Sequence, residues 1–84
     1  MSVIDDSQAG AYAPAFRKGA ERFVALHPDE IYHITASRTQ SGLCVTISGG
    51  RLKFAHQFTL NPVLDGQLEQ SVFDALEQVR SQAH

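Results

Sequence analysis

Two consecutive glycines, Gly49 and Gly50, separate two segments in which apolar and polar side chains alternate. The segments are LCVTIS (43–48) and RLKFAHQFTL (51–60). Alternation of this kind is typical of β-strands with one buried face. A two-residue turn between paired strands needs positive φ, which glycine adopts at little cost. The sequence therefore predicts an antiparallel β-hairpin with the two glycines as its turn.

This turn also predicts which residues of the two strands face each other. With both glycines in the loop, Val45 is opposite Phe54 and Leu43 is opposite His56, so the apolar side chains of both strands share one face. His56 then lies at the margin of the buried face, where water or a loop carbonyl can satisfy its ring nitrogens. We interpret it as a packing residue, with a ligand or catalytic role and pH-dependent packing as the alternatives.

A third strand precedes the hairpin. Residues 31–38 (IYHITASR) alternate in the same way, with Tyr32 and Ile34 on the apolar side. The connection TQSG (39–42) has the composition of a turn. A two-residue or a four-residue loop keeps the apolar faces of the two strands in phase, so both registers remain open. We therefore expect the three strands to form an antiparallel meander in chain order.

Helical spacing of apolar residues predicts two helices, over 13–27 and 66–81. Pro28 ends the first helix because its ring cannot continue the hydrogen-bond ladder. Asp65 is the expected N-cap of the second. Gly19 lies inside the first helix, where glycine costs up to about 1 kcal/mol relative to alanine. We therefore expect another element to pack closely against it.

These elements predict an α+β fold of two layers, a helix, a three-stranded antiparallel meander and a helix (αβββα), with both helices on one sheet face. Residues 1–11 are mostly small or polar and predict a flexible N-terminal arm, while 12–84 form a single domain. The predicted core consists of Phe16, Phe23, Val24, Tyr32, Ile34, Leu43, Val45, Ile47, Leu52, Phe54, Phe58, Leu68, Val72, Leu76 and Val79.

Composition excludes several classes of function. The net charge of −2 over 84 residues argues against a broad attraction for nucleic acid or for an anionic membrane. The single cysteine, Cys44, cannot form an internal disulfide, and the first residues lack a basic leader followed by an apolar stretch, so we expect a cytoplasmic protein. No apolar run approaches the roughly 20 residues that span a bilayer, so no membrane contact is expected.

Catalytic and metal sites find little support. Cys44 and His33 lie on the same face of neighbouring strands, and in the tighter register they are diagonal neighbours, which suggests a cysteine nucleophile with a histidine base. A flat sheet offers neither a pocket nor an orienting third group, so a cysteine-dependent enzyme is the third hypothesis. The four histidines are far apart in the sequence. We therefore predict no enzyme activity, no cofactor and no metal.

The uncovered face of the sheet is the expected site of binding. It carries short hydroxyl side chains, no acidic residue and a few basic ones, and such a flat surface is cheap to desolvate. The first hypothesis is a small non-catalytic binding or adaptor protein, a homodimer that uses this face or an edge strand. The candidate binding residues are His33, Thr35, Thr46, Arg51, Lys53 and Gln57.

The αβββα order of residues 12–82 is similar to that of the double-stranded RNA-binding domain. Such domains hold phosphates with a lysine cluster at the start of the second helix, whereas this chain has LDGQLEQ there, with Asp65 and Glu69. The resemblance is one of element order, and it implies nucleic-acid binding as the alternative function. The contacts would come from the sheet and the first helix, namely Arg17, Lys18, Arg22, Arg38, Arg51 and Lys53.

Overall fold

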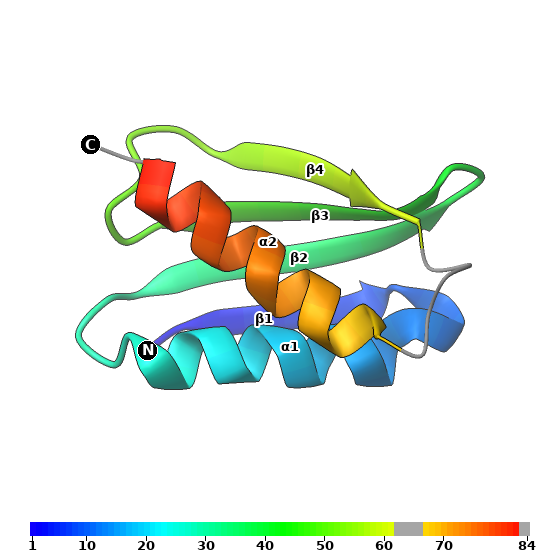
Figure 1. The fold of residues 1–84 in the computed structure, drawn as a ribbon, viewed down its shortest axis with the longest axis horizontal. Coiled ribbons are helices and arrows are strands. Elements are labelled where there is room, and N and C mark those ends of the chain that lie inside the picture. The colour runs from blue at the N-terminus through cyan, green and yellow to red at the C-terminus, as the bar shows by residue number, and fades with distance from the viewer. Residues whose placement is uncertain (62–66, 83–84) are drawn as a thin grey trace.

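The protein is a four-stranded sheet with two helices packed on one of its faces (Figure 1). The computed structural model describes residues 1–61 and 67–82. The sheet has the strand order β1-β2-β3-β4. In chain order the elements are β1 (Val3–Gln8), the 3-10 turn η1 (Gly10–Tyr12), α1 (Ala13–Leu26), β2 (Tyr32–Thr39), β3 (Gly42–Gly49), β4 (His56–Leu60) and α2 (Leu68–Gln82).

The predicted α+β class and the helix, strand, strand, strand, helix order are confirmed. α1 has Pro14 in its first turn, where the missing N–H is not needed, and it ends before Pro28. α2 covers the predicted segment from Leu68 onward. The predicted N-cap Asp65 lies outside the described residues.

The prediction of three strands and a flexible arm is wrong for residues 3–8, which form the additional strand β1. β1 pairs parallel to β2, with Val3 opposite His33 and Asp5 opposite Thr35, so the sheet is mixed. Ile4 packs against the core, and Ala9, directly after the strand, is fully buried. A parallel partner is reached only through the α1 crossover, and β1 has just two apolar residues, so local periodicity gives little sign of it.

The register predicted for β3 and β4 is also wrong. Val45 is opposite Phe58, and Ile47 is opposite His56 instead of Leu52, so the partners lie four residues further along the chain. Because this shift is even, each side chain of β4 keeps its expected face. The strand predicted over 51–60 is shortened to His56–Leu60, and a connection over residues 50–55 replaces the tight turn.

The two glycines do not form a two-residue turn. They allow the backbone at the end of β3 to lie close against the start of β2. Both have positive φ, of 94° at Gly49 and 52° at Gly50. A Cβ on Gly50 would lie 2.4 Å from ring carbons of Tyr32, and the Gly50 N–H donates to the carbonyl of Ile31 at 2.7 Å. The backbone is thus held against the start of β2 before it can turn into β4.

Because the connection is longer than predicted, two residues lie in positions that differ from those expected. Phe54, predicted to be in the core, lies in the connection with 77% of its surface exposed. His56, expected opposite Leu43 at the margin of the core, is exposed and lies opposite Ile47. Leu52 remains buried, as predicted, and anchors the connection.

The rest of the core agrees well with the sequence. Apart from Phe54, the predicted core residues are buried or half-buried, and Ala9, Ala20 and Ala36 join them. The two helices approach each other closely at Gly19, because a Cβ there would lie 2.5 Å from the carbonyl oxygen of Glu69. The expected close packing at this glycine is confirmed.

Candidate interaction surfaces

The open face of the sheet carries four of the six candidate binding residues. Thr35, Thr46 and Gln57 stand in one row across β2, β3 and β4, and β1 adds Asp5 to the same row. His33 lies one row further along, opposite Ser48. The structure thus brings these four candidates onto one surface, and their side chains are exposed or half-buried.

The two remaining candidates, Arg51 and Lys53, lie outside the strands. Both belong to the connection before β4, because the register differs from the one that placed them on the sheet. The expectation of a mildly basic face without acidic residues is therefore wrong. Its acidic member is Asp5, whose pKa is lowered because the hydroxyl and the backbone N–H of Ser7 donate to its carboxylate.

The structure does not bring Cys44 and His33 together. β2 and β3 pair with Arg38 opposite Leu43 and Thr39 opposite Gly42, so Gln40 and Ser41 form the turn between them. Cys44 therefore stands opposite Ser37, and His33 is opposite Ser48, two rows away on the same face. The side-chain amide of Gln57 donates to the Cys44 sulfur, with Nε2 2.9 Å from Sγ. The geometry does not support a cysteine–histidine pair.

β1 is an edge strand whose backbone is protected. It carries Asp5 and Asp6, and its register with β2 shifts between Asp5 and Gln8. Arg17 of α1 reaches over it, donating to the carboxylate of Asp6 at 2.9 Å and to the carbonyl of Ile4 at 3.1 Å. The first of these bonds lowers the pKa of Asp6. Charges, an irregular register and a covered carbonyl all discourage pairing with a further strand.

β4, the opposite edge, has none of these protections. Its sequence, HQFTL, holds no formally charged residue and no proline. In the described part of the chain it pairs with β3 alone, and its other side faces outward in Figure 1. On the helix side, Phe58 and Leu60 are half-buried against the core. Over residues 1–61 and 67–82, this edge therefore combines an outer side that pairs with no other strand with an incompletely covered apolar row.

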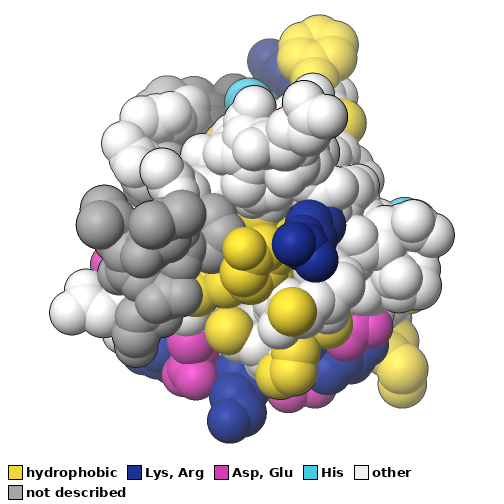
Figure 2. Space-filling view, turned by 90° about the vertical axis from the view of Figure 1, so that its right-hand side faces the viewer, with side chains coloured by type: hydrophobic (Ala, Val, Ile, Leu, Met, Phe, Trp, Pro, Cys, Tyr) yellow, Lys and Arg dark blue, Asp and Glu magenta, His cyan; other side chains and the backbone are white. Residues whose placement is uncertain are grey.

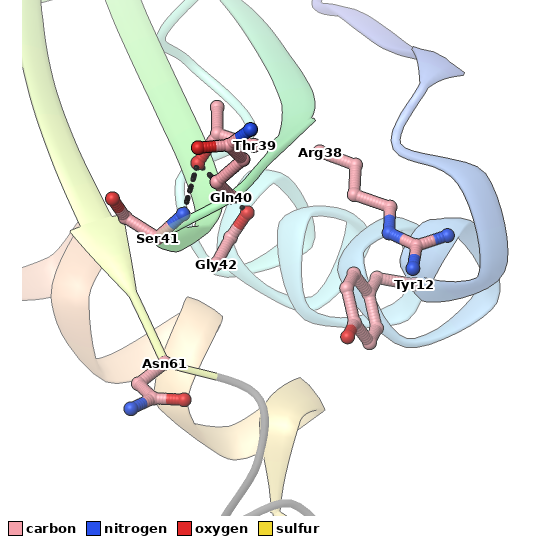
Figure 3. A pocket seen from close by; sticks show the side chains of 7 residues that line it. All are labelled: Tyr12, Arg38, Thr39, Gln40, Ser41, Gly42 and Asn61. Carbon is pink, nitrogen blue, oxygen red and sulfur yellow. Dashed lines mark hydrogen bonds between the residues drawn. The ribbon is translucent and has the colours of Figure 1, made fainter.

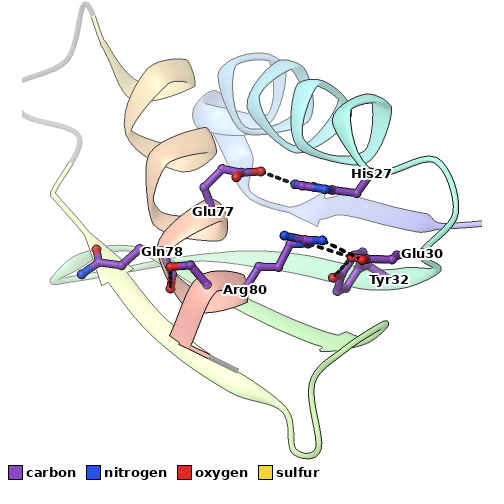
Figure 4. A network of polar contacts seen from close by, with 7 residues as sticks. His27, Glu30, Tyr32, Glu77, Gln78 and Arg80 are labelled. Atoms are coloured by element: carbon purple, nitrogen blue, oxygen red, sulfur yellow. Dashed lines mark hydrogen bonds and ion pairs between the residues drawn. The ribbon is translucent and has the colours of Figure 1, made fainter. Parts of the chain in front are cut away.

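A polar network joins the C-terminal half of α2 to the segment between α1 and β2 (Figure 4). Arg80 donates to both carboxylate oxygens of Glu30, with Nε–Oε1 2.8 Å and Nη2–Oε2 2.7 Å, and the hydroxyl of Tyr32 also donates to Glu30. His27 and Glu77 form a second pair. Each of these groups has its partner within the network, and the bonds join α2 to the segment that leads into β2. We therefore interpret the network as structural, since it holds α2 in place over the sheet.

Glu30 gives the folded state a dependence on acid pH. The hydrogen bonds from Arg80 and, next, Tyr32 lower the pKa of its carboxyl from 4.5 to about 2. An ionised Glu30 therefore stabilises the folded state above pH 4.5, and this contribution is lost as the pH falls towards 2. In chemical denaturation at several pH values, wild type should be more stable than Glu30→Gln at neutral pH, and the difference should shrink between pH 4.5 and 2.

A matched control for this measurement is Glu21→Gln, since the Glu21 side chain is 57% exposed and its nearest cation, Arg17 Nη1, lies 3.6 Å away. We expect little change in the free energy of unfolding for this variant. A Glu30→Gln effect that persists unchanged to pH 2 would contradict the assignment of the acid dependence to Glu30.

A shallow pocket of about 350 Å³ lies at the end of the sheet that carries the β2–β3 turn (Figure 3). Figure 2 shows this end of the molecule, where apolar side chains gather beside a basic one. The guanidinium carbon of Arg38 lies 5.6 Å from the ring centroid of Tyr12. Thr39 is engaged within the turn, bonded to Ser41 and Gly42. The Ser41 side chain points away from Arg38, so the polar groups do not converge on one point.

The basic residues proposed for nucleic-acid contacts do not form one patch. Arg17 pairs with Asp6, and Arg22 lies 3.3 Å from Glu69 and over the ring of Phe73. Arg38 is at the β2–β3 turn, whereas Arg51 and Lys53 lie in the β3–β4 connection at the opposite end of the strands. Sequence spacing alone shows neither these ion pairs nor this separation.

Three comparisons with known proteins give no relative. The chain has no significant match to a protein-family model, to a curated protein or to a solved structure. Over residues 1–61 and 67–82, no three histidine, cysteine, aspartate or glutamate side chains come close enough together to hold a metal ion. Neither of the two described α-helices has the length and apolar character needed to cross a bilayer.

Proposed function

We propose that the chain is a non-catalytic protein-interaction domain that works as a homodimer and makes its contacts through the sheet. The observation that carries this proposal is that the two faces and the two edges of the sheet differ. The helices cover one face and leave the other open, and the β1 edge is protected whereas the β4 edge is not. The open face has short, mostly hydroxyl side chains, which suit contact with another protein.

The size of the chain supports self-association. A domain of 84 residues buries only about 60–65% of the surface of its unfolded chain, so its stability is small. Partly exposed apolar side chains at the edge, such as Phe58 and Leu60, gain stability when a partner covers them. Pairing two copies is a common way for a small domain to bury more apolar surface.

Sedimentation velocity over a wide range of protein concentration tests the proposal. We expect a species of twice the 9.2 kDa monomer mass to dominate at high concentration and to dissociate on dilution. A monomer at every concentration would overturn the homodimer. Urea unfolding should shift to a higher midpoint as the protein concentration rises, because association stabilises the folded state by mass action.

Nucleic-acid binding is the second candidate, favoured by the charge distribution along the chain. Residues 31–61 contain no aspartate or glutamate, yet they hold Arg38, Arg51 and Lys53, with the exposed Phe54 next to Lys53. An exposed aromatic ring beside cations suits base stacking. A salt titration of binding to duplex and single-stranded RNA separates the two functions, since absence of binding at low salt removes this candidate.

A further inference from the structure

We propose that two copies of the chain pair edge to edge through β4, in antiparallel orientation, so that their two sheets become one continuous sheet. This inference rests on the proposed homodimer and specifies the surface that forms it. The second copy is the partner because β4 is complementary to itself. Its five residues, His56–Leu60, can align about a two-fold axis at Phe58.

The contrast between the two edges selects β4 over β1. A second strand approaching β1 would meet Asp5 and Asp6 and an irregular register, and the carbonyl of Ile4 is already bonded to Arg17. A second β4 approaching β4 meets no formal charge, so two identical edges bring no like charges together. Unprotected edges of this kind pair readily with another strand.

The register follows from the two faces of β4. About an axis at Phe58, Gln57 faces Thr59 of the second copy on the open side, and His56 faces Leu60 of the second copy on the helix side. The two Phe58 rings lie across the axis and cover each other. A shift by one residue would instead place Phe58 opposite an exposed polar side chain. A shift by two residues would keep Phe58 on the helix side but would pair only three of the five β4 residues, so the axis at Phe58 is the alignment that pairs the whole strand.

Charge substitutions at Gln57 and Thr59 test the register. Both side chains are exposed, so the variants should fold with the stability of the wild-type monomer. Q57K/T59K places lysine opposite lysine in the dimer, and Q57E/T59E places glutamate opposite glutamate. We expect each variant alone to self-associate about tenfold more weakly than wild type. An equimolar mixture should regain association as a heterodimer, because each lysine then faces a glutamate.

The matched control is H33K/S37K, which adds two lysines to exposed positions of β2 on the open face. Under the edge-to-edge arrangement it should dimerise like wild type. Dimers that are unaffected by Q57K/T59K but weakened by H33K/S37K would overturn the β4 interface and leave the homodimer intact on the open face. A wild-type protein that is monomeric throughout overturns the proposed function and this inference together.

A mixture of the lysine and glutamate variants that stays monomeric would also overturn the register. Hydrogen exchange on the wild-type chain gives an independent readout that needs no variant. The β4 amide groups should exchange more slowly as the protein concentration rises, because pairing covers the outer side of the strand. Exchange in β4 that does not change with concentration would contradict pairing through this strand.

Discussion

Gly19→Val is expected to abolish the cooperative folding of this protein. A Cβ at this position would lie 2.5 Å from the carbonyl oxygen of Glu69 and 2.9 Å from the Cβ of Val72, and valine adds two further methyl groups. The oxygen belongs to the backbone of α2, so the clash cannot be relieved by rotation of a side chain. The helices would have to separate, and their buried side chains, such as Phe16 of α1 and Leu76 of α2, would lose packing in the core.

Far-UV circular dichroism and urea denaturation measure this loss, with Lys18→Val as the matched control. Lys18 is the preceding residue of α1 and is exposed, so valine there lowers helix propensity without a clash and should cost only a few tenths of a kcal/mol. Equal stabilities of the two variants would contradict the close crossing at Gly19. Gly19→Ala gives a graded version, for which we expect a loss of about 1–3 kcal/mol despite the higher helix propensity of alanine.

Phe23→Ala is expected to lower the free energy of unfolding by about 3–5 kcal/mol. Phe23 is fully buried, and its ring centroid lies 5.1 Å from those of both His27 and Tyr32. Removal of the Phe23 ring leaves a cavity beside Tyr32. Because the Tyr32 hydroxyl donates to Glu30, this cavity lies next to the polar network that holds α2. For a domain of this size such a loss is a large part of the total stability.

Phe54→Ala is the contrasting variant, because the sequence assigned both phenylalanines to the core. With 77% of Phe54 exposed, its truncation should change the free energy of unfolding by no more than about 0.5 kcal/mol. Urea denaturation at one low protein concentration compares the two variants without a contribution from association. Similar losses for both would show that Phe54 packs into the core, in the hairpin register that the glycine pair suggested.

Part of the candidate interface can be predicted from the sequence. The alternation in 31–38 and 43–48 correctly separates a buried row from a row of hydroxyl side chains, so it places both Thr35 and Thr46 on the open face, and the structure makes them cross-strand partners. Arg51 and Lys53 were misplaced, because their position depends on where β4 begins. The protection of the β1 edge by Arg17 had no sequence signal, since it joins residues of a strand that was itself not predicted.

The pattern of apolar and polar residues is enough to predict which side chains point inward along most of the chain and where the helices and two of the strands lie. Periodicities of two and of about 3.6 residues arise between neighbours in the chain, so they can be read locally. The register of β4 and the presence of β1 cannot be read from such local patterns. Both depend on contacts between distant segments, the ring of Tyr32 against Gly50 in one case and the parallel pairing of Ile4 with Ile34 in the other.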